Sequence, residues 1–347
     1  MSEIKPFIKW VGGKTQIIEN LIKQFPKKIN NYHEIFLGGG SVLLTILHLQ
    51  KKNIISIENK IYAYDINQIL IFLYKNIQSQ YKDLHKNLID YFNNYDSLDG
   101  KVVHRKPKNL DEAKTSKESY YYYCRSKFNS LQKNESIEKS ALFIFLNKTC
   151  FRGLYREGPN GFNVPYGHYK TTPKCISLEE LKKISEFIKD VEFSCLDYKE
   201  SLKEIEKNDF VYMDPPYAPE NKNSFVGYNK DGFSLEDHKL LFKLINNLNE
   251  EKSIVEIVEE NLNNQIIEEN EINEIENKLE KIDINKENNQ EENKIKILLS
   301  NAKVDLVINS FDKKKYFFEE LICKRSINSK NPESKTTEIL IRNYNIE

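Results

Sequence analysis

The stretch from residue 32 to residue 65 constrains the fold more than any other part of this 347-residue chain. It runs from the apolar segment Tyr32–Phe36 through the turn Gly38–Gly40 into an apolar helix that starts at Ser41. It then ends in the short apolar strand Ile61–Tyr64. A strand, a helix and a second strand at this spacing form a βαβ unit, which requires a parallel sheet. We therefore predict an α/β fold.

The strand pattern returns only after a long interruption. Residues 76–190 carry long helical patterns rich in Tyr, Lys and Asn, broken by a glycine-rich segment from Arg152 to Tyr169. A sheet interrupted by a helical insertion is the economical interpretation. Helices are also expected at Lys14–Gln24 and Leu235–Leu248. Further strands are expected at Val191–Cys195, Phe210–Met213, Ile295–Leu299 and Glu338–Arg342.

Charge is distributed unevenly along the chain, although the formal net charge is zero. Residues 250–294 hold 15 acidic and 5 basic side chains, which leaves 47 basic and 37 acidic residues elsewhere. A basic body fits a polyanionic partner such as nucleic acid, although a lysine-rich proteome would give the same balance. Within the acidic segment, four aliphatic residues follow 3-4-3 spacing, as in a short coiled coil. Low complexity favours a solvated loop, and we assign this segment no catalytic role.

No apolar stretch is long enough to span a bilayer, and the first residues lack the apolar core of a signal peptide. The five cysteines are scattered and have no C-x-x-C spacing, which argues against a disulfide framework and against a zinc site. We expect a cytoplasmic, intracellular protein with reduced thiols and no metal.

The tetrapeptide Asp214-Pro215-Pro216-Tyr217 follows the apolar run at 210–213, and its residue types suit one chemical task. Proline fixes φ and has no N–H, so the turn is stiff. The Asp214 carboxylate and a proline carbonyl can each accept a hydrogen bond from an amino group, while the Tyr217 ring offers a stacking surface. These groups suit the binding of a flat exocyclic amine for attack on an electrophile. An ordinary β-turn after a strand is the alternative.

Glycine-rich turns add two candidate ligand contacts. Gly12-Gly13-Lys14 offers backbone donors and a cation to an anion, although Ile8 breaks the phosphate-loop pattern. The alternative is a helix-entry loop beside a buried Trp10. The second turn, Gly38–Gly40, lies between a strand and a helix, where a nucleoside can lie against bare backbone.

Two acidic residues follow predicted strands. Asp65 stands where a carboxylate can bind both ribose hydroxyls, or where it only caps a turn. Asp197-Tyr198 comes after Cys195 and could hold an adenine ring and its amino group.

Taken in order, these motifs form a specific set. They are Phe7-Ile8-Lys9-Trp10-Val11-Gly12-Gly13-Lys14, Phe36–Ser41, Asp65-Ile66-Asn67, Phe162–Gly167, Asp197-Tyr198, Asp214–Tyr217 and Leu299-Ser300-Asn301. The set resembles the Dam-type, alpha-group DNA adenine-N6 methyltransferases, and the resemblance covers nearly the whole chain except the acidic segment.

The resemblance implies a Rossmann-like, S-adenosylmethionine-dependent methyltransferase sheet with an inserted helical target recognition domain. Residues 1–75 and 191–347 would form the catalytic domain, with the acidic insertion at about 250–294, and residues 76–190 would recognise DNA. Cofactor contacts would come from Trp10, Lys14, Phe36, Gly38, Asp65, Asp197, Tyr198 and Asp214, and DNA contacts from Phe151, Arg152, Leu154, Arg156, Pro165 and His168. Arg152 stands where the family usually has Asn, and His168 where one branch has Arg, so the recognition sequence is open.

The implied reaction transfers a methyl group from S-adenosylmethionine to N6 of adenine in double-stranded DNA, at GATC or a related short site. The reaction would proceed by base flipping and direct methyl transfer, without a metal. The catalytic residues would be Asp214, Pro215, Pro216 and Tyr217. Three alternatives stay open: an RNA adenine-N6 methyltransferase, a catalytically silent DNA-binding module and a protein-glutamine methyltransferase. The sequence leaves open whether the protein is paired with a cognate restriction endonuclease that acts separately.

Overall fold

The computed structural model describes residues 6–218, 232–250, 254, 257–258, 294–324 and 335–346. The chain divides into two compact units. The first unit comprises Met1–Lys23 and Phe36–Cys195, and the second comprises Gln24–Ile35 and Leu196–Glu347. Most of the acidic segment, including its heptad-like aliphatic residues, lies outside the described residues. The functional division into a catalytic and a recognition domain stays a prediction.

The first unit is mainly helical. Its helices are η1 (Lys14–Gln16), α1 (Ile18–Ile22), α2 (Ser41–Lys51), α3 (Gln68–Asp96), α4 (Leu110–Ala113), α5 (Lys117–Ser130), α6 (Ile137–Thr149), η2 (Phe151–Gly153) and α7 (Leu178–Phe187). Its strands are β3 (Ser56–Ile57), β4 (Ile61–Tyr64), β5 (Glu157–Gly158), β6 (Gly161–Phe162) and β7 (Val191–Ser194).

Local sequence signals set where these helices begin. The Asn67 side chain accepts a hydrogen bond from the Leu70 amide at 3.1 Å and caps α3. Ser177 and Glu180 form a capping box at the start of α7. Gly40 precedes α2 with φ of +65°, a left-handed backbone that glycine adopts without steric cost. The helix predicted at Lys14–Gln24 instead divides into η1 and α1.

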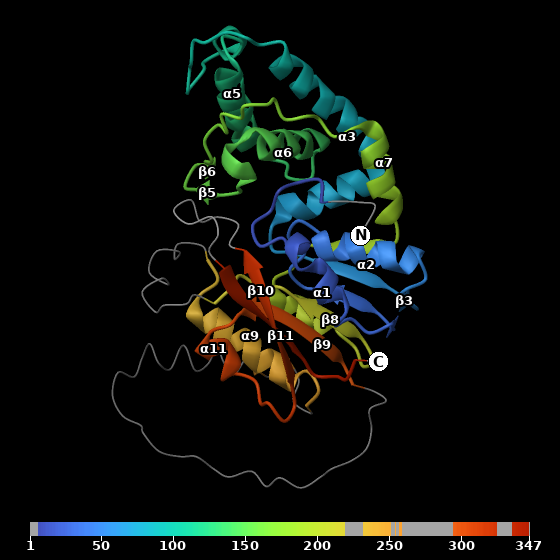
Figure 1. Cartoon of the computed structure of the whole chain (residues 1–347). Coiled ribbons are helices and arrows are strands. Elements are labelled where there is room, and N and C mark those ends of the chain that lie inside the picture. Colours follow the sequence, from blue (N-terminus) through green and yellow to red (C-terminus); the bar gives the residue numbers. More distant parts are fainter. Residues whose placement is uncertain are drawn as a thin grey trace, which may run out of the picture. The chain divides into compact units, whose positions relative to one another are not determined.

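The core of the first unit lies between α3, α5 and α6, which lie side by side in Figure 1. Most residues of α6 are buried, and its middle, Ala141–Leu146, is an unbroken apolar run that is buried throughout. Phe145 of α6 meets Phe92 of α3 with ring centroids 5.2 Å apart, and Tyr120 of α5 at 6.0 Å. These ring contacts give the helical part of the chain a core of its own.

The second unit holds five strands that neighbour one another in the order β10-β11-β9-β8-β2. Strands β2, β8 and β9 run parallel, whereas β11 and β10 are antiparallel additions at one edge. The elements are β1 (Lys28–Ile29), β2 (Tyr32–Glu34), α8 (Tyr198–Ser201), η3 (Leu202–Glu204), β8 (Phe210–Met213), α9 (Leu235–Asn247), β9 (Lys296–Ala302), α11 (Asp305–Ile308), β10 (Phe317–Lys324) and β11 (Lys335–Arg342).

The α/β prediction and its parallel strand pairs are confirmed. Strands β4 and β8 have the predicted bounds, and β4 pairs in parallel with β7 within the first unit. Strand β9 is longer than predicted because it continues through Ala302, and β11 begins at Lys335 rather than at residue 338. Strand β10 was not predicted.

Two further observations concern the described residues. All five cysteines lie in described parts of the chain, and none of them forms a disulfide. None of the described helices combines the length and the apolar character that crossing a membrane requires.

Candidate active site

The tetrapeptide Asp214–Tyr217 lies at the carboxyl end of β8, a strand whose four residues are all buried. A continuous apolar run of this kind is typical of a parallel strand covered on both faces. Pro215 is buried, Asp214 and Tyr217 are half-buried, and Pro216 is exposed. The rigid strand therefore delivers a carboxylate and an aromatic ring at its end through a turn that two prolines stiffen.

The hydroxyl of Tyr217 is held by two polar side chains. It donates to Oε2 of Glu338 at 2.7 Å and lies 3.1 Å from Oγ of Ser300. Burial, with the charges of Asp214 and Glu338, raises the pKa of Tyr217 well above its ordinary value. The phenol is therefore neutral at physiological pH, and it can donate a hydrogen bond but cannot serve as a base.

The backbone after the tetrapeptide is fixed by the motif Ser300-Asn301 on β9. Oδ1 of Asn301 accepts from the Ala218 amide at 3.1 Å and from the Ala302 amide at 2.8 Å. Ser300 and Asn301 are both fully buried. Through these two bonds, Asn301 holds the backbone where the chain leaves the tetrapeptide turn.

In the first unit, Asp65 organises the glycine turn that follows Phe36. Its Oδ2 accepts from the Gly38 amide at 2.8 Å, and its Oδ1 accepts from the Asn67 amide at 2.8 Å. Burial raises the pKa of Asp65 although both bonds oppose the rise. Asp65 thus serves as a turn organiser, which was the alternative to ligand binding, while each carboxylate oxygen keeps one lone pair for a further donor.

Trp10 lies against the same turn. A Cβ added to Gly38 would lie 3.0 Å from the Trp10 ring, and one added to Gly39 would lie 2.9 Å from its Cβ. The half-buried indole also stacks on Tyr155, with ring centroids 5.5 Å apart. Trp10 is therefore a shared wall of the glycine turn, and Tyr155 is a neighbour that no sequence motif indicated.

Lys14 is buried, and its Nζ donates to the Gly12 carbonyl at 2.9 Å. Its amide donates to Oγ of Ser41, the first residue of α2, at 3.2 Å. These bonds join the predicted Gly-Gly-Lys turn to the helix that follows the second glycine turn. Trp10, Lys14, Gly38 and Asp65 therefore lie close together within the first unit.

Asp197 and Tyr198 have structural partners in the second unit. Asp197 caps α8, because its Oδ1 accepts from the amides of Lys199 and Glu200 at 2.7 and 3.2 Å. The Tyr198 hydroxyl points to Asp237, 3.3 Å from Oδ1. These contacts account for both side chains without a ligand, and their predicted role with an adenine ring stays a prediction.

The six predicted DNA contacts lie on two chain segments of the first unit that pair with each other. The Phe151 amide donates to the Pro165 carbonyl at 2.8 Å, and the Asn163 amide donates to the Arg156 carbonyl at 3.0 Å. The short hairpin β5–β6 closes this pair. Four of the residues come before the hairpin: Phe151, Arg152, Leu154 and Arg156. The other two, Pro165 and His168, come after it. The fold therefore brings all six together.

Two of these positions have left-handed backbones. Arg152 has φ of +57° and His168 has φ of +44°. Asparagine adopts this region more readily than most residues, which gives a physical reason for the family's usual Asn at position 152. The Arg152 guanidinium lies 5.2 Å from the Phe151 ring centroid.

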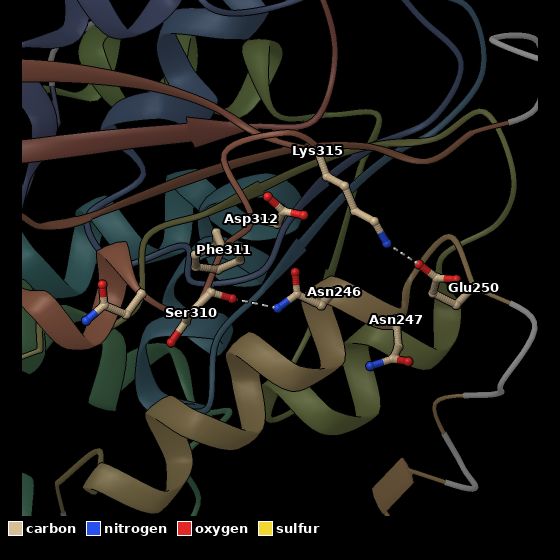
Figure 2. Close-up of a pocket in the computed structure, with 8 residues that line it drawn as sticks. Asn246, Asn247, Glu250, Ser310, Phe311, Asp312 and Lys315 are labelled. Atoms are coloured by element: carbon tan, nitrogen blue, oxygen red, sulfur yellow. Dashed lines mark hydrogen bonds and ion pairs between the residues drawn. The ribbon is translucent and has the colours of Figure 1, made fainter. Parts of the chain in front are cut away.

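The second unit also has a shallow pocket, which is lined by residues from α9, by Glu250 and by residues from the segment 309–315 (Figure 2). In it Asn246 donates to the Ser310 carbonyl at 2.9 Å, and Lys315 forms an ion pair with Glu250 at 3.1 Å. None of its lining residues is a predicted site residue, and we assign it no role in the reaction.

Comparison with known proteins decides the family. Residues 10–292 match the model of the D12 class N6 adenine-specific DNA methyltransferases. The chain belongs to this class. The family match confirms that the sequence motifs of this methyltransferase are those of a Dam-type DNA adenine methyltransferase.

Individual relatives agree with this assignment. The methyltransferase is 37% identical over 256 residues to the Type II methyltransferase M.MjaIII of Methanocaldococcus jannaschii, covering 71% of this chain and 81% of the relative. It is 32% identical over 253 residues to the DNA adenine methylase of Haemophilus influenzae, covering 72% and 77%. The Type II methyltransferase M1.LlaDCHI of Lactococcus lactis is 33% identical over 240 residues, covering 67% and 73%.

Methyltransferases of this family imply S-adenosylmethionine as co-substrate, and the residues present fit its chemistry. A nucleoside with an amino-acid tail offers hydroxyl and ammonium donors, and within the first unit Asp65 presents a half-buried carboxylate directly after β4 that can accept them. Sequence motifs did not indicate several residues that contact the predicted site residues or their chain neighbours. Tyr155 and Glu338 are the clearest, together with Asn147, whose side chain bonds both the amide and the carbonyl of Lys9 at 2.9 and 2.8 Å.

Proposed function

We propose that this methyltransferase transfers the methyl group of S-adenosylmethionine to N6 of a flipped adenine in duplex DNA. The observation that carries the proposal is the position of Asp214–Tyr217 at the end of buried β8, with the Tyr217 hydroxyl tied to Glu338. When bound, the co-substrate supplies an electrophilic methyl group on sulfonium. The proposed cofactor contacts are Trp10, Lys14, Phe36, Gly38, Asp65, Asp197, Tyr198 and Asp214.

Asp214 and Pro215 would make the adenine amine reactive. The lone pair of N6 is delocalised into the ring, so the nitrogen is a poor nucleophile. Hydrogen bonds from both amino hydrogens, to the Asp214 carboxylate and to the Pro215 carbonyl, favour a pyramidal nitrogen with a localised lone pair. Holding that nitrogen in line with the methyl group supplies much of the rate acceleration.

Tyr217 would stack on the adenine once it has left the duplex. Its ring is half-buried and its hydroxyl is anchored, so the surface offered to the base has a defined orientation. The pKa of Tyr217 is raised, and its role is therefore to bind the base and not to accept a proton.

We further propose that the target recognition domain includes the paired segments around β5–β6 and that the site is GATC or a close relative. Arg156 is exposed, and its Nε donates to Oδ1 of Asn163 at 2.7 Å. That bond orients the guanidinium, whose terminal nitrogens suit bidentate bonds to O6 and N7 of guanine. Leu154 and Pro165 would contact a thymine methyl group, and Phe151 would fill the space that the flipped base leaves.

Replacing Arg156 with alanine is expected to cost about 1–3 kcal/mol of discrimination at one base pair. The measurement is the methylation rate on a set of duplexes that vary each position of the site. Lys182→Ala, which removes an exposed cation from α7, serves as the matched control. Equal weakening on all sequences would instead assign Arg156 to a phosphate.

A direct assay separates the proposed function from its alternatives. The protein is incubated with S-adenosylmethionine labelled in the methyl group and with duplex DNA, RNA or protein as acceptor. Label in N6-methyladenine of duplex DNA supports the proposal. Label in RNA alone or on glutamine, or no transfer with intact DNA binding, supports one of the alternatives. Mapping N6-methyladenine in cells that express the protein then gives the recognition sequence, and a motif without a guanine next to the target adenine would overturn the GATC assignment.

A further inference from the structure

The antiparallel edge of the sheet in the second unit reaches the tetrapeptide through Glu338 on β11. A carboxylate only accepts hydrogen bonds, so the Tyr217 hydroxyl donates its single proton to Glu338 at 2.7 Å. The Ser300 hydroxyl, 3.1 Å away, then donates to the phenol oxygen. The three side chains form a directed chain from Ser300 through Tyr217 to Glu338.

Strand register explains how these residues meet. In the antiparallel pair, Ser300 stands opposite Leu340, and Ala302 stands opposite Glu338. Ser300 and Glu338 are therefore diagonal neighbours on one face of the sheet, a spacing that long side chains bridge. Strand β11 lies next to β9 in Figure 1.

The chain of hydrogen bonds fixes the tyrosine at both ends. The backbone after Tyr217 is held through the Ala218 amide and Asn301 at 3.1 Å, and the far end of the ring is held through the hydroxyl. A tyrosine side chain has two rotatable torsions, so anchoring its backbone and its tip determines the plane of the ring. Burial and the neighbouring carboxylates raise the pKa of Tyr217, which keeps the proton that the anchor needs.

We propose that Glu338 is a positioning residue: its carboxylate holds the Tyr217 ring in the plane on which the flipped adenine stacks. The inference rests on the proposed function and adds to it the residue that orients the aromatic surface. It also gives the antiparallel strand β11 a part in positioning the base.

The test compares Glu338→Ala, Glu338→Gln, Tyr217→Phe and the double variant Tyr217→Phe with Glu338→Ala. Glu338→Ala is expected to lower kcat about tenfold to hundredfold, because misplacement by about 1 Å has effects of this size. Glu338→Gln retains an accepting oxygen and is expected to restore most of kcat. Tyr217→Phe keeps the ring and loses only the anchor, so the double variant should be no slower than the slower single variant.

Two further readouts separate positioning from a general structural effect. Duplexes with 2-aminopurine at the target position report the flipped base by fluorescence, and the signal with Glu338→Ala should fall while KM for S-adenosylmethionine stays unchanged. Glu320→Ala on β10 removes an exposed carboxylate that pairs with Lys303, and it should behave as wild type. If Glu338→Ala does not fold, Tyr217→Phe still tests the hydroxyl.

Wild-type kcat in both Glu338→Ala and Tyr217→Phe, or independent losses that multiply in the double variant, would overturn the proposal. The proposed function is judged separately, because it fails only if the wild-type protein transfers no methyl group to duplex DNA.

A second inference comes from a basic loop in the first unit. Residues 100–108 contain four exposed cations and no acidic residue, and they also expose Val102 by 62% and Val103 by 44%. The cations are Lys101, Arg105, Lys106 and Lys108.

The basic loop is anchored to the start of α5. The Val102 carbonyl accepts from the hydroxyls of Thr115 at 2.9 Å and Ser119 at 3.2 Å, and the His104 amide donates to Oγ of Ser119 at 2.8 Å. The loop is therefore held in a defined position, and its cations are presented on a fixed backbone.

Glu118 places the loop beside the predicted DNA contacts. Its Oε1 lies 3.4 Å from Nε of Arg105, and its Oε2 lies 3.6 Å from Nε2 of His168. One nearly buried carboxylate thus has the basic loop on one side and a predicted recognition residue on the other. A duplex that contacts His168 would meet the loop with its sugar-phosphate backbone.

We infer that the basic loop 100–108 is a second DNA surface, which binds phosphates without reading bases. Neutralising cations that contact phosphates lowers the slope of log K against log salt by about 0.9 per contact. The variant Lys101→Gln, Arg105→Gln, Lys106→Gln and Lys108→Gln should therefore lower the slope by about 2–4. Its recognition sequence, and its kcat at saturating DNA, should stay those of the wild type.

The matched control removes the same charge from exposed lysines of α3 and α7, as Lys82→Gln, Lys86→Gln, Lys182→Gln and Lys183→Gln. It should keep the wild-type slope. A wild-type slope in the loop variant, or an equal fall in the control, would overturn the inference. Because the proposed function requires only that the wild-type protein methylates duplex DNA, its failure would be seen in the wild type alone.

Discussion

Asp214→Ala should lower kcat for methyl transfer by a factor of about 10²–10³, the cost of removing one preorganised group that stabilises the transition state. One of the two acceptors for the adenine amino group disappears, and the contact proposed with the co-substrate weakens. The turn itself should persist, because Pro215 is buried and the Ala218 amide is held by Asn301. The measurement is single-turnover methylation of a duplex that contains GATC.

Two control variants make the test specific. Asp214→Asn keeps one accepting oxygen without the charge, so it should retain more activity than the alanine variant. Asp190→Ala removes an exposed carboxylate and should behave as wild type. A folded Asp214→Ala protein with activity within tenfold of wild type would contradict the assigned chemistry, whatever the effect of the other two changes.

The fold was predictable where the signal is local. Strand β8 reads as a short, wholly apolar run followed by Asp214 and two prolines, and β4 reads as a short apolar run followed by Asp65, so both were predicted with their observed bounds. Burial on both faces leaves no alternation that could be confused with a surface strand.

The fold was not predictable where pairing decides it. Strand β10 carries the adjacent acidic residues Glu319 and Glu320 between apolar pairs, so it lacks a period-two alternation, and it leaves Ile322 73% exposed. Such a sequence forms a strand only because β11 is available as an antiparallel partner. The extension of β9 through Ala302 has the same cause, since Ala302 pairs with Glu338.

The residues of the candidate site also fall into those that local motifs indicate and those that only strand pairing brings into place. Motifs indicated Asp65, Asp214 and Tyr217 because their residue types suit the chemistry and each follows a strand. Motifs did not indicate Glu338, which approaches Tyr217 from a strand 121 residues further along the chain. Contacts of this range depend on strand register, and one sequence does not reveal which of many glutamates will be in place.

The largest effect on stability is expected at Asp209, one residue before β8. Its carboxylate is fully buried, and Oδ2 accepts from Nε2 of His33 at 2.9 Å and from the Glu206 amide at 2.9 Å. Oδ1 accepts from the side-chain amide of Asn31 at 2.7 Å. These bonds tie the starts of the parallel strands β2 and β8 together, at the opposite end of β8 from Asp214.

Asp209→Ala should lower the free energy of unfolding by about 3–5 kcal/mol, because it leaves buried donors without their acceptor. Burial alone raises the pKa of Asp209, but the bonds from His33, Glu206 and Asn31 outweigh it and hold the pKa below its ordinary value. A carboxyl whose pKa is lower in the folded state stabilises the fold above its unfolded pKa of about 3.9, and this contribution is lost as pH falls through the folded pKa.

Denaturation at pH 7 and at decreasing pH measures both effects, with the exposed Asp83→Ala as control. The difference between wild type and variant should be largest at pH 7 and should shrink below about pH 4. The folded variant should keep its kcat at low temperature, since Asp209 lies away from the tetrapeptide. A difference that stays constant down to the acid transition, or a loss of kcat without a loss of stability, would show that the Asp209 cluster does not act through its charge on the fold.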